Sequence, residues 1–217
     1  MPARRALSPR KKPVQRRAQD TVDAILEAAA RVLAERGYAA ATTNRIAERA
    51  GVSIGSLYEY FPGKDAILAQ LLERHVEEGA RDVLAWLAEA ARAPLPVRAL
   101  IDGLLARMLE LHERRPTLHR VLFEEAPHPH QTSACVLRVE DALAHGFEAA
   151  LRAAPGRRSG AGDVEAHLAV QTAEALCHRF VLHGIHELGR AAFLRGSADL
   201  LEGYLGTPRV ARRGGAR

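Results

Sequence analysis

Residues 42–64 read TTNRIAERAGVSIGSLYEYFPGK, and this stretch decides the fold. It predicts a short helix over about 43–50, a turn that contains glycine, and a second helix that follows Ser53 and ends near residue 60. Thr42 or Thr43 caps the first helix, because a hydroxyl oxygen can accept from the free N–H groups of the first turn. Two short helices joined by a glycine-containing turn form a helix-turn-helix.

The second helix of this stretch carries the side chains suited to meet DNA. In a helix-turn-helix the second helix lies in the major groove, and small residues at its start let the backbone approach the base edges. Tyrosine hydroxyls, and a lysine that follows the helix, can donate to phosphate oxygens. The apolar positions that lock the two helices at a fixed angle are Ile46, Ala47, Ala50, Val52 and Leu57. The exposed positions are Ser53, Ile54, Gly55, Ser56, Tyr58, Glu59 and Tyr60.

The segment 17–68 resembles the DNA-binding domain of the TetR family of bacterial transcriptional repressors. The resemblance implies a homodimer of all-helical subunits, in which three N-terminal helices hold the DNA-reading domain and the last two long helices form a four-helix dimer interface. It also implies an effector pocket in the C-terminal bundle. The positions that carry the match are Ile25–Ala29, Gly37-Tyr38, Thr42-Thr43, Ile46-Ala47, Ala50–Ser53, Leu57–Phe61 and Lys64.

The same resemblance implies which side chains bind DNA. The positions that contact phosphate hold Thr43, Tyr58, Tyr60 and Lys64. The positions from which some members reach a base or a phosphate hold Asn44 and Arg45. The positions where the recognition helix meets the groove hold Ser53, Ile54, Gly55 and Ser56.

Two positions of the second helix depart from the family pattern. Ile54 stands where a lysine or another polar residue is common; it can contact a thymine methyl group, but it can neither donate nor accept a hydrogen bond. Glu59 stands where many members have histidine, tryptophan or tyrosine. Phosphate would repel its carboxylate, which leaves a neighbouring arginine or a cytosine amine as its partner. The bases that the protein reads therefore stay open.

The rest of the chain also predicts helices only. Apolar residues recur at helical spacing, and no segment alternates long enough to form a strand, so we expect an all-α fold of about nine helices. Beyond 43–60, the expected helices cover about 21–37, 64–92, 97–114, 116–125, 25 residues around 136–151, 163–187 and 190–205. The expected domains are a basic disordered arm (1–16), the helix-turn-helix domain (17–63), a ligand-binding and dimerisation domain (64–207) and a basic disordered tail (208–217).

Charge is distributed unevenly along the 217 residues. Residues 1–64 hold 12 basic and 6 acidic side chains, whereas 65–208 hold 15 basic and 20 acidic ones. A basic front on an acidic body indicates that a polyanion binds at the N-terminal end. No apolar run reaches the roughly 20 residues of a membrane-spanning helix. Two cysteines form neither a disulfide framework nor a cysteine-rich zinc site, so we expect a reducing cytoplasm.

The helix expected from Val164 onward is apolar on two sides, so it must be covered on two sides. One cover is its own bundle, and the other is either a partner subunit or further helices of the same chain. The side chains that we expect to line an effector pocket are Trp86, Met108, Phe123 and Phe147. Aromatic and methionine side chains on four different helices can line an apolar cavity, or they can simply fill the core.

No catalytic set and no cofactor motif is recognisable in the sequence. His178, His183 and His186 lie close together in one expected helix, next to Cys177. They make a poor metal site, because adjacent residues such as Cys177 and His178 point about 100° apart on a helix. We therefore predict no metal site.

The sequence thus predicts a homodimeric, DNA-binding repressor that a small, apolar ligand releases from a palindromic operator in double-stranded DNA. A regulator that needs no ligand, an activator, or one controlled by a protein partner is the first alternative. A helical small-molecule-binding protein or enzyme is the second, and a histidine-based metal sensor is the third.

Overall fold

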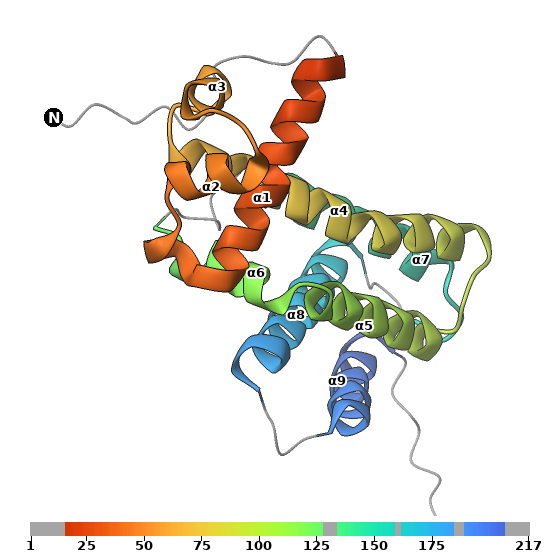
Figure 1. Cartoon of the computed structure of the whole chain (residues 1–217). Helices are drawn as coiled ribbons and strands as arrows, with labels where there is room; N and C mark the ends of the chain where they lie inside the picture. The colour runs from red at the N-terminus through yellow and green to blue at the C-terminus, as the bar shows by residue number, and fades with distance from the viewer. Residues whose placement is uncertain (1–15, 128–133, 159–161, 185–188, 207–217) are drawn as a thin grey trace, which may run out of the picture. The chain divides into compact units, whose positions relative to one another are not determined.

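A computed structural model describes residues 16–127, 134–158, 162–184 and 189–206 (Figure 1). These ranges contain helices and no β-strand, which confirms the predicted all-α fold of about nine helices. The helices are α1 (Arg16–Ala40), α2 (Thr43–Ala50), α3 (Ile54–Tyr60), α4 (Lys64–Arg92), α5 (Val97–Glu113), α6 (Pro116–Arg120), α7 (Ala134–Ala153), α8 (Asp163–His183) and α9 (Arg190–Leu205), with a π-helical turn, η1 (Val121–Glu125), after α6. The expected basic arm, apart from Arg16, and the basic tail lie outside the described residues.

The chain divides into two compact units. The N-terminal unit comprises Met1–Glu78 and Arg115–Leu137, and the C-terminal unit comprises Gly79–Arg114 and Arg138–Arg217. The helix α4 therefore contributes residues to both units, as does α7. These are units of packing, so a functional division after residue 63 stays a prediction.

The core of the N-terminal unit forms on one face of α1. Ile25, Ala29 and Leu33 recur at four-residue spacing and are almost fully buried, as expected for the apolar stripe of an amphipathic helix. The helix α1 packs against α2, α6 and η1. These contacts place α6 and η1 in the same unit as the helix-turn-helix, although 66 residues or more separate them from α2 along the chain.

Gly37 interrupts α1, close to the point where the sequence predicts that this helix stops. Its φ of 71° lies in the left-handed region, which glycine adopts without the steric cost of a Cβ atom. The change of direction in the chain exposes the next N–H group, and Tyr38 N donates to Glu125 Oε2 at 3.0 Å. A Cβ atom on Gly37 would also lie 3.0 Å from that oxygen. Glycine is therefore required here for both its backbone angle and its size.

The core of the C-terminal unit forms around α5, which packs against α8 and α9. The apolar side chains of α5 that are at most 2% exposed are Leu100, Ile101, Leu104, Leu105, Met108 and Leu109. Alanines at positions 166, 169 and 173 give α8 a narrow buried face, which lets the helices approach closely. Gly103 serves the same purpose for Trp86, whose ring lies where a Cβ atom on Gly103 would stand.

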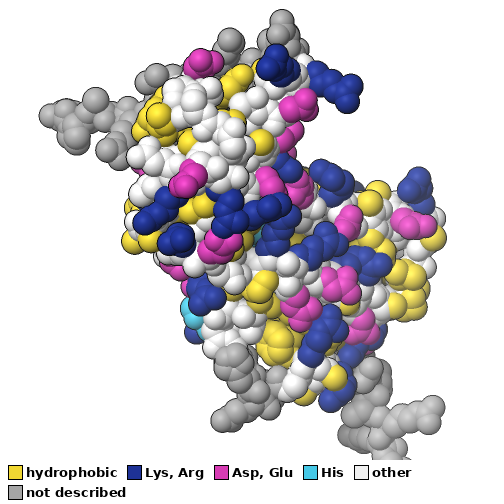
Figure 2. Space-filling model, in the orientation of Figure 1, with side chains coloured by type: hydrophobic (Ala, Val, Ile, Leu, Met, Phe, Trp, Pro, Cys, Tyr) yellow, Lys and Arg dark blue, Asp and Glu magenta, His cyan; other side chains and the backbone are white. Residues whose placement is uncertain are grey.

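Charged side chains reinforce the contact between α5 and α9 at its edge. Arg98 on α5 donates to Asp199 and Glu202 on α9 at 2.6 and 3.1 Å, and to Asp102 on its own helix. The hydrogen bond to Asp199, followed by that to Glu202, raises the pKa of the Arg98 guanidinium. On the face drawn in Figure 2, basic and acidic side chains are interspersed, and several basic ones lie close together across its middle. Among the described helices, none is long and apolar enough to cross a membrane.

Replacing Gly103 by alanine tests the packing of this core. Alanine normally stabilises a helix by about 1 kcal/mol relative to glycine, but here its Cβ would lie 2.3 Å from Trp86 Cζ2. We expect Gly103→Ala to lower the free energy of unfolding by about 1–3 kcal/mol, as overpacking does, in urea denaturation. Phenylalanine lacks that ring atom, so Gly103→Ala should lose most of this cost in a Trp86→Phe background. An equal cost in both backgrounds would contradict the assigned contact.

Candidate nucleic-acid interface

The first helix of the helix-turn-helix, α2, is fixed at both ends by local hydrogen bonds. Thr42, and not Thr43, is the N-cap: its backbone is extended and its hydroxyl accepts from Arg45 N at 3.3 Å. At the other end Gly51 adopts a φ of 70°, and its N–H donates to Glu48 O. A glycine in the left-handed region is the usual way to end a helix sharply. The hydroxyl of Thr43 therefore does not cap the helix.

The recognition helix α3 begins at a serine cap, as predicted. Ser53 Oγ accepts from Ser56 N at 3.0 Å and lies 2.9 Å from Ser56 Oγ. Ile54 and Gly55 follow this cap at exposed positions, and a Cβ atom on Gly55 would meet only Ser53 Oγ, at 3.7 Å. The packing of the protein therefore does not require glycine here, whereas a close approach of the backbone to a partner would.

Three of the predicted phosphate contacts line one crevice of about 550 Å³. Thr43 Oγ1 lies 3.1 Å from the Tyr58 hydroxyl oxygen, so the two side chains share a hydrogen bond between α2 and α3. Lys64 begins α4 at the same crevice. The residues that line the crevice are Tyr38, Ala39, Ala41, Thr42, Thr43, Tyr58, Pro62, Gly63, Lys64, Asp65 and Ala66. The crevice thus collects hydroxyl and ammonium donors, which suit a phosphate group.

Tyr38 holds Lys64 in place at this crevice. Lys64 Nζ donates to the carbonyl oxygen of Tyr38 at 2.9 Å, and it also lies 3.7 Å from the centroid of the Tyr38 ring. Burial lowers the pKa of Lys64, and the charge of Asp65 partly opposes this effect. An ammonium has three donors, so the bond to the carbonyl leaves two for another acceptor. Tyr38 is not among the DNA-binding residues predicted from the sequence, in which the Gly37-Tyr38 pair marks only the end of the preceding helix.

The other predicted DNA-binding residues do not line the crevice. Asn44 is exposed on α2, and Arg45 donates to the carbonyl oxygen of Ala40. Tyr60 is half-buried and packs against the core of the N-terminal unit, so it is less accessible than the sequence predicts. Ser53, Ile54, Gly55 and Ser56 form a separate group at the start of α3.

Positive charge within 42–64 is already engaged in the folded chain. Of the three basic residues in this stretch, Arg45 and Lys64 bond to backbone carbonyl oxygens and Arg49 pairs with Glu35. Glu59 is exposed on α3. The expected contact with DNA therefore relies on hydroxyl groups and the ammonium of Lys64 as well as on net charge.

The residues expected to line an effector pocket fall into different parts of the fold. Met108 and Phe147 are buried in the core of the C-terminal unit. Trp86 is half-buried at the edge of that core, with the Arg107 guanidinium 4.4 Å from its ring centroid. Phe123 belongs to the N-terminal unit, where it stacks on His119 with ring centroids 4.3 Å apart. A common pocket for all four stays a prediction.

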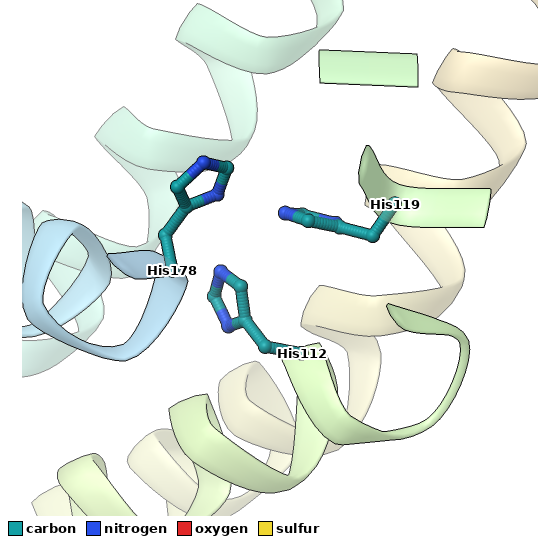
Figure 3. Close-up of side chains that lie close together, drawn as sticks. All are labelled: His112, His119 and His178. Carbon is teal, nitrogen blue, oxygen red and sulfur yellow. The ribbon is translucent and has the colours of Figure 1, made fainter. Parts of the chain in front are cut away.

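In the structure, His178 and Cys177 of α8 contact residues of another helix. His178 meets His112 of α5 edge to face, with ring centroids 5.8 Å apart (Figure 3). Cys177 is fully buried; its Sγ lies 3.8 Å from Leu105 O, and burial raises the pKa of the thiol to about 12. A thiol held protonated in this way is a poor metal ligand. His183 is exposed and His186 lies outside the described residues.

His119, also drawn in Figure 3, belongs to the N-terminal unit. Its Nδ1 lies 3.0 Å from His75 Nε2 on α4, and both rings lie near Phe123. The buried imidazole of His119 therefore has a polar neighbour and an aromatic neighbour within its own unit.

The helices α1–α3 and the crevice beside them define a helix-turn-helix protein. A sequence model of the family described as bacterial regulatory proteins, tetR family, matches residues 25–71. A second model, described as a tetracyclin repressor-like C-terminal domain, matches residues 96–205, which is half of the chain. The chain belongs to the TetR family of DNA-binding transcriptional regulators.

Individual relatives agree with this assignment. The chain is 31% identical over 149 residues to the nucleoid occlusion factor SlmA of Haemophilus influenzae, a match that covers 66% of this chain and 65% of SlmA. It is 43% identical over 65 residues to the transcriptional repressor KstR2 of Mycolicibacterium smegmatis, covering 30% and 28% of the two chains. The structure of SmeT, the repressor of the Stenotrophomonas maltophilia multidrug efflux pump SmeDEF, superimposes with a TM-score of 0.63 at 22% identity, covering 91% and 98%. SmeT thus shares the fold, and the matched stretch spans slightly less than two thirds of SlmA.

Lys64 and Tyr58 should make distinguishable contributions to the binding of duplex DNA of random sequence. Lys64→Ala should weaken binding and reduce the slope of log K against log salt concentration by about 0.9, because one fewer phosphate is neutralised. Tyr58→Phe should weaken binding with the slope unchanged, because the lost hydroxyl is neutral. Fluorescence anisotropy over a salt series measures both, and Lys64→Arg is the charge-conserving control. A slope that Lys64→Ala leaves unchanged would remove Lys64 from the phosphate contacts.

Proposed function

We propose that this TetR-family regulator is a repressor that binds a palindromic operator in double-stranded DNA as a homodimer and is released by a small, apolar molecule. The observation that carries the DNA-binding part is the crevice at which Thr43, Tyr58 and Lys64 meet. The names of two relatives, KstR2 and SmeT, describe repressors and support this direction of control.

Two groups of residues contact different parts of the DNA, one the phosphate backbone and the other the bases. The crevice binds a phosphate and fixes the height of α3 in the major groove. The exposed start of α3 then reads the bases: the hydroxyls of Ser53 and Ser56 can donate or accept, and Ile54 can contact a thymine methyl group. Gly55 lets the helix backbone approach the base edges. The basic arm adds attraction that does not depend on sequence.

The dimer forms through α8 and α9. Val164 and Leu168 lie one helical turn apart on α8 and are 66% and 47% exposed, and Leu200 on α9 is 59% exposed. Large apolar side chains of this kind, exposed on the two helices, are typical of a surface that a partner covers. A twofold dimer presents two recognition helices, so its operator is palindromic with half-sites about 34–36 Å apart.

Charged substitutions on α8 and α9 test the dimer. Leu168→Glu combined with Leu200→Glu should shift the protein from dimer to monomer in sedimentation velocity, because burying two unpaired carboxylates is costly. Leu137→Glu, at another exposed leucine in α7, is the matched control and should leave the dimer intact. A double variant that still sediments as a dimer would place the interface elsewhere.

Release by a ligand requires that the ligand bind one arrangement of the two recognition helices more tightly than the other. We place the ligand in the C-terminal unit, among the proposed lining residues Trp86, Met108 and Phe147. The helix α4 begins with Lys64 and also carries Trp86, so one continuous helix joins a proposed ligand contact to a proposed DNA contact. A displacement of α4 would alter both.

Selection of bound duplexes from a random pool tests the DNA-binding proposal. We expect an inverted repeat whose half-site centres lie about 10 base pairs, or a multiple of this, apart. Enrichment of an asymmetric site, or no enrichment, would overturn it. The selected operator then serves to screen small apolar compounds by anisotropy. If no compound lowers operator affinity, control without a ligand replaces release by a ligand, and the DNA-binding proposal stands.

A further inference from the structure

Three potential metal ligands from α7 and α8 lie together on the surface of the C-terminal unit. One ligand atom each from Asp141, His145 and His167 lies within 4.8 Å of the other two. Asp141 Oδ1 occupies the centre of the group, 3.4 Å from His145 Nδ1 and 3.4 Å from His167 Nε2. The two imidazole rings meet nearly at right angles, with centroids 5.6 Å apart.

The helices explain why these side chains meet. Asp141 and His145 are four residues apart on α7, so they occupy the same face one turn apart. His167 comes from the first half of α8, within the same compact unit. Sequence spacing does not predict this cluster, because 26 residues separate Asp141 from His167.

His167 is already oriented as a metal-bound histidine would be. Its Nδ1 lies 2.9 Å from both the carbonyl oxygen and the carboxylate Oδ1 of Asp163, so Nδ1–H donates to Asp163, and its Nε2 lies 3.4 Å from Asp141 Oδ1. Histidines that bind metals almost always donate their second ring N–H to a carboxylate or a carbonyl in this way.

The spacing of the ligand atoms fits a tetrahedral ion. With metal–ligand bonds of about 2.0–2.1 Å, two ligands of a tetrahedral centre lie about 3.3 Å apart, close to both distances from Asp141 Oδ1. The two histidine nitrogens lie within 4.8 Å of each other. His145 Nδ1 also lies 2.8 Å from Asp141 O, so ligation through this nitrogen requires it to give up that hydrogen bond and to lose its proton. Asp141 and His145 are largely exposed to solvent, which leaves space for water as a fourth ligand.

We propose that Asp141, His145 and His167 bind one divalent transition-metal ion of the zinc class and that this ion fastens α7 to α8. Imidazole and carboxylate ligands in a tetrahedral arrangement favour Zn²⁺ or Co²⁺ over Mg²⁺ and Ca²⁺, which prefer six or more oxygen ligands. The charges of Asp141 and Asp163 match that of the ion. The ion joins α7 and α8 at one point and thereby stabilises their packing against each other.

Calorimetric titration of the metal-free full chain with zinc chloride tests the proposal. All variants are made in a His178→Gln protein, a change in the same helix but outside the cluster. This background prevents zinc bound near His178 from adding to the measured number of zinc equivalents. Adding His167→Gln or Asp141→Asn to this background should remove one equivalent of bound zinc. Asp163→Asn should leave the equivalent in place but weaken its binding by about 10- to 100-fold, as changes in hydrogen-bond partners of ligands do.

Two further measurements distinguish this site from zinc bound elsewhere on the chain. Co²⁺ should give the visible absorption of a tetrahedral centre in the background variant and lose it on His167→Gln. Zinc should raise the melting temperature of the background variant and not that of the variant with His167→Gln, while circular dichroism without metal is the same for both. Zinc uptake should persist in the Leu168→Glu/Leu200→Glu variant, because one chain supplies all three ligands. Equal zinc uptake with and without His167→Gln would overturn the proposal.

Discussion

The burial of Leu57 and Phe61 beneath α3 is the interaction on which the DNA-binding surface depends. A helix of seven residues is too short to be stable alone, so tertiary packing must hold α3 in shape. Leu57 and Phe61 lie one turn apart and are both fully buried, and Ile46 of α2 is buried in the same core. Their burial fixes the rotation of α3 about its axis, and thereby decides that Ile54, Gly55 and Tyr58 face solvent.

The donors at the crevice are positioned before any partner arrives. Thr43 and Tyr58 restrain each other, and Tyr38 restrains Lys64 through a carbonyl oxygen and a ring face. Side chains that are already ordered lose less conformational entropy on binding than free ones. In the proposed complex with DNA, these ordered donors compensate for the small net charge of the helix-turn-helix, because well-placed bonds then add to attraction over distance.

Sequence patterns predicted features that neighbouring residues determine. The serine cap of α3, the breaks at Gly37 and Gly51 and the apolar faces of the helices all depend on a few consecutive residues, and the structure has each of them. Contacts between residues distant in the chain were not predictable. Periodicity shows which face of a helix is buried, but it does not show which other helix covers that face. The contact of Tyr38 with Lys64 and that of Asp141 with His167 are therefore visible only in the structure. For the same reason the sequence allowed Met108 and Phe147 to be either pocket lining or core, and the structure buries both in the core of the C-terminal unit.

The packing around Met108 and Phe147 constrains how a ligand can act. Both side chains are buried, and three alanines of α8 lie fully buried in the same core, so a molecule that enters among them must displace packed side chains. Well-packed cores change between discrete arrangements and do not deform continuously. A ligand that binds there therefore selects an arrangement different from the one described, and its binding energy must exceed the cost of the change. Such a core can couple ligand binding to α4 without a preformed cavity, because the rearrangement that makes room for the ligand is itself the conformational change.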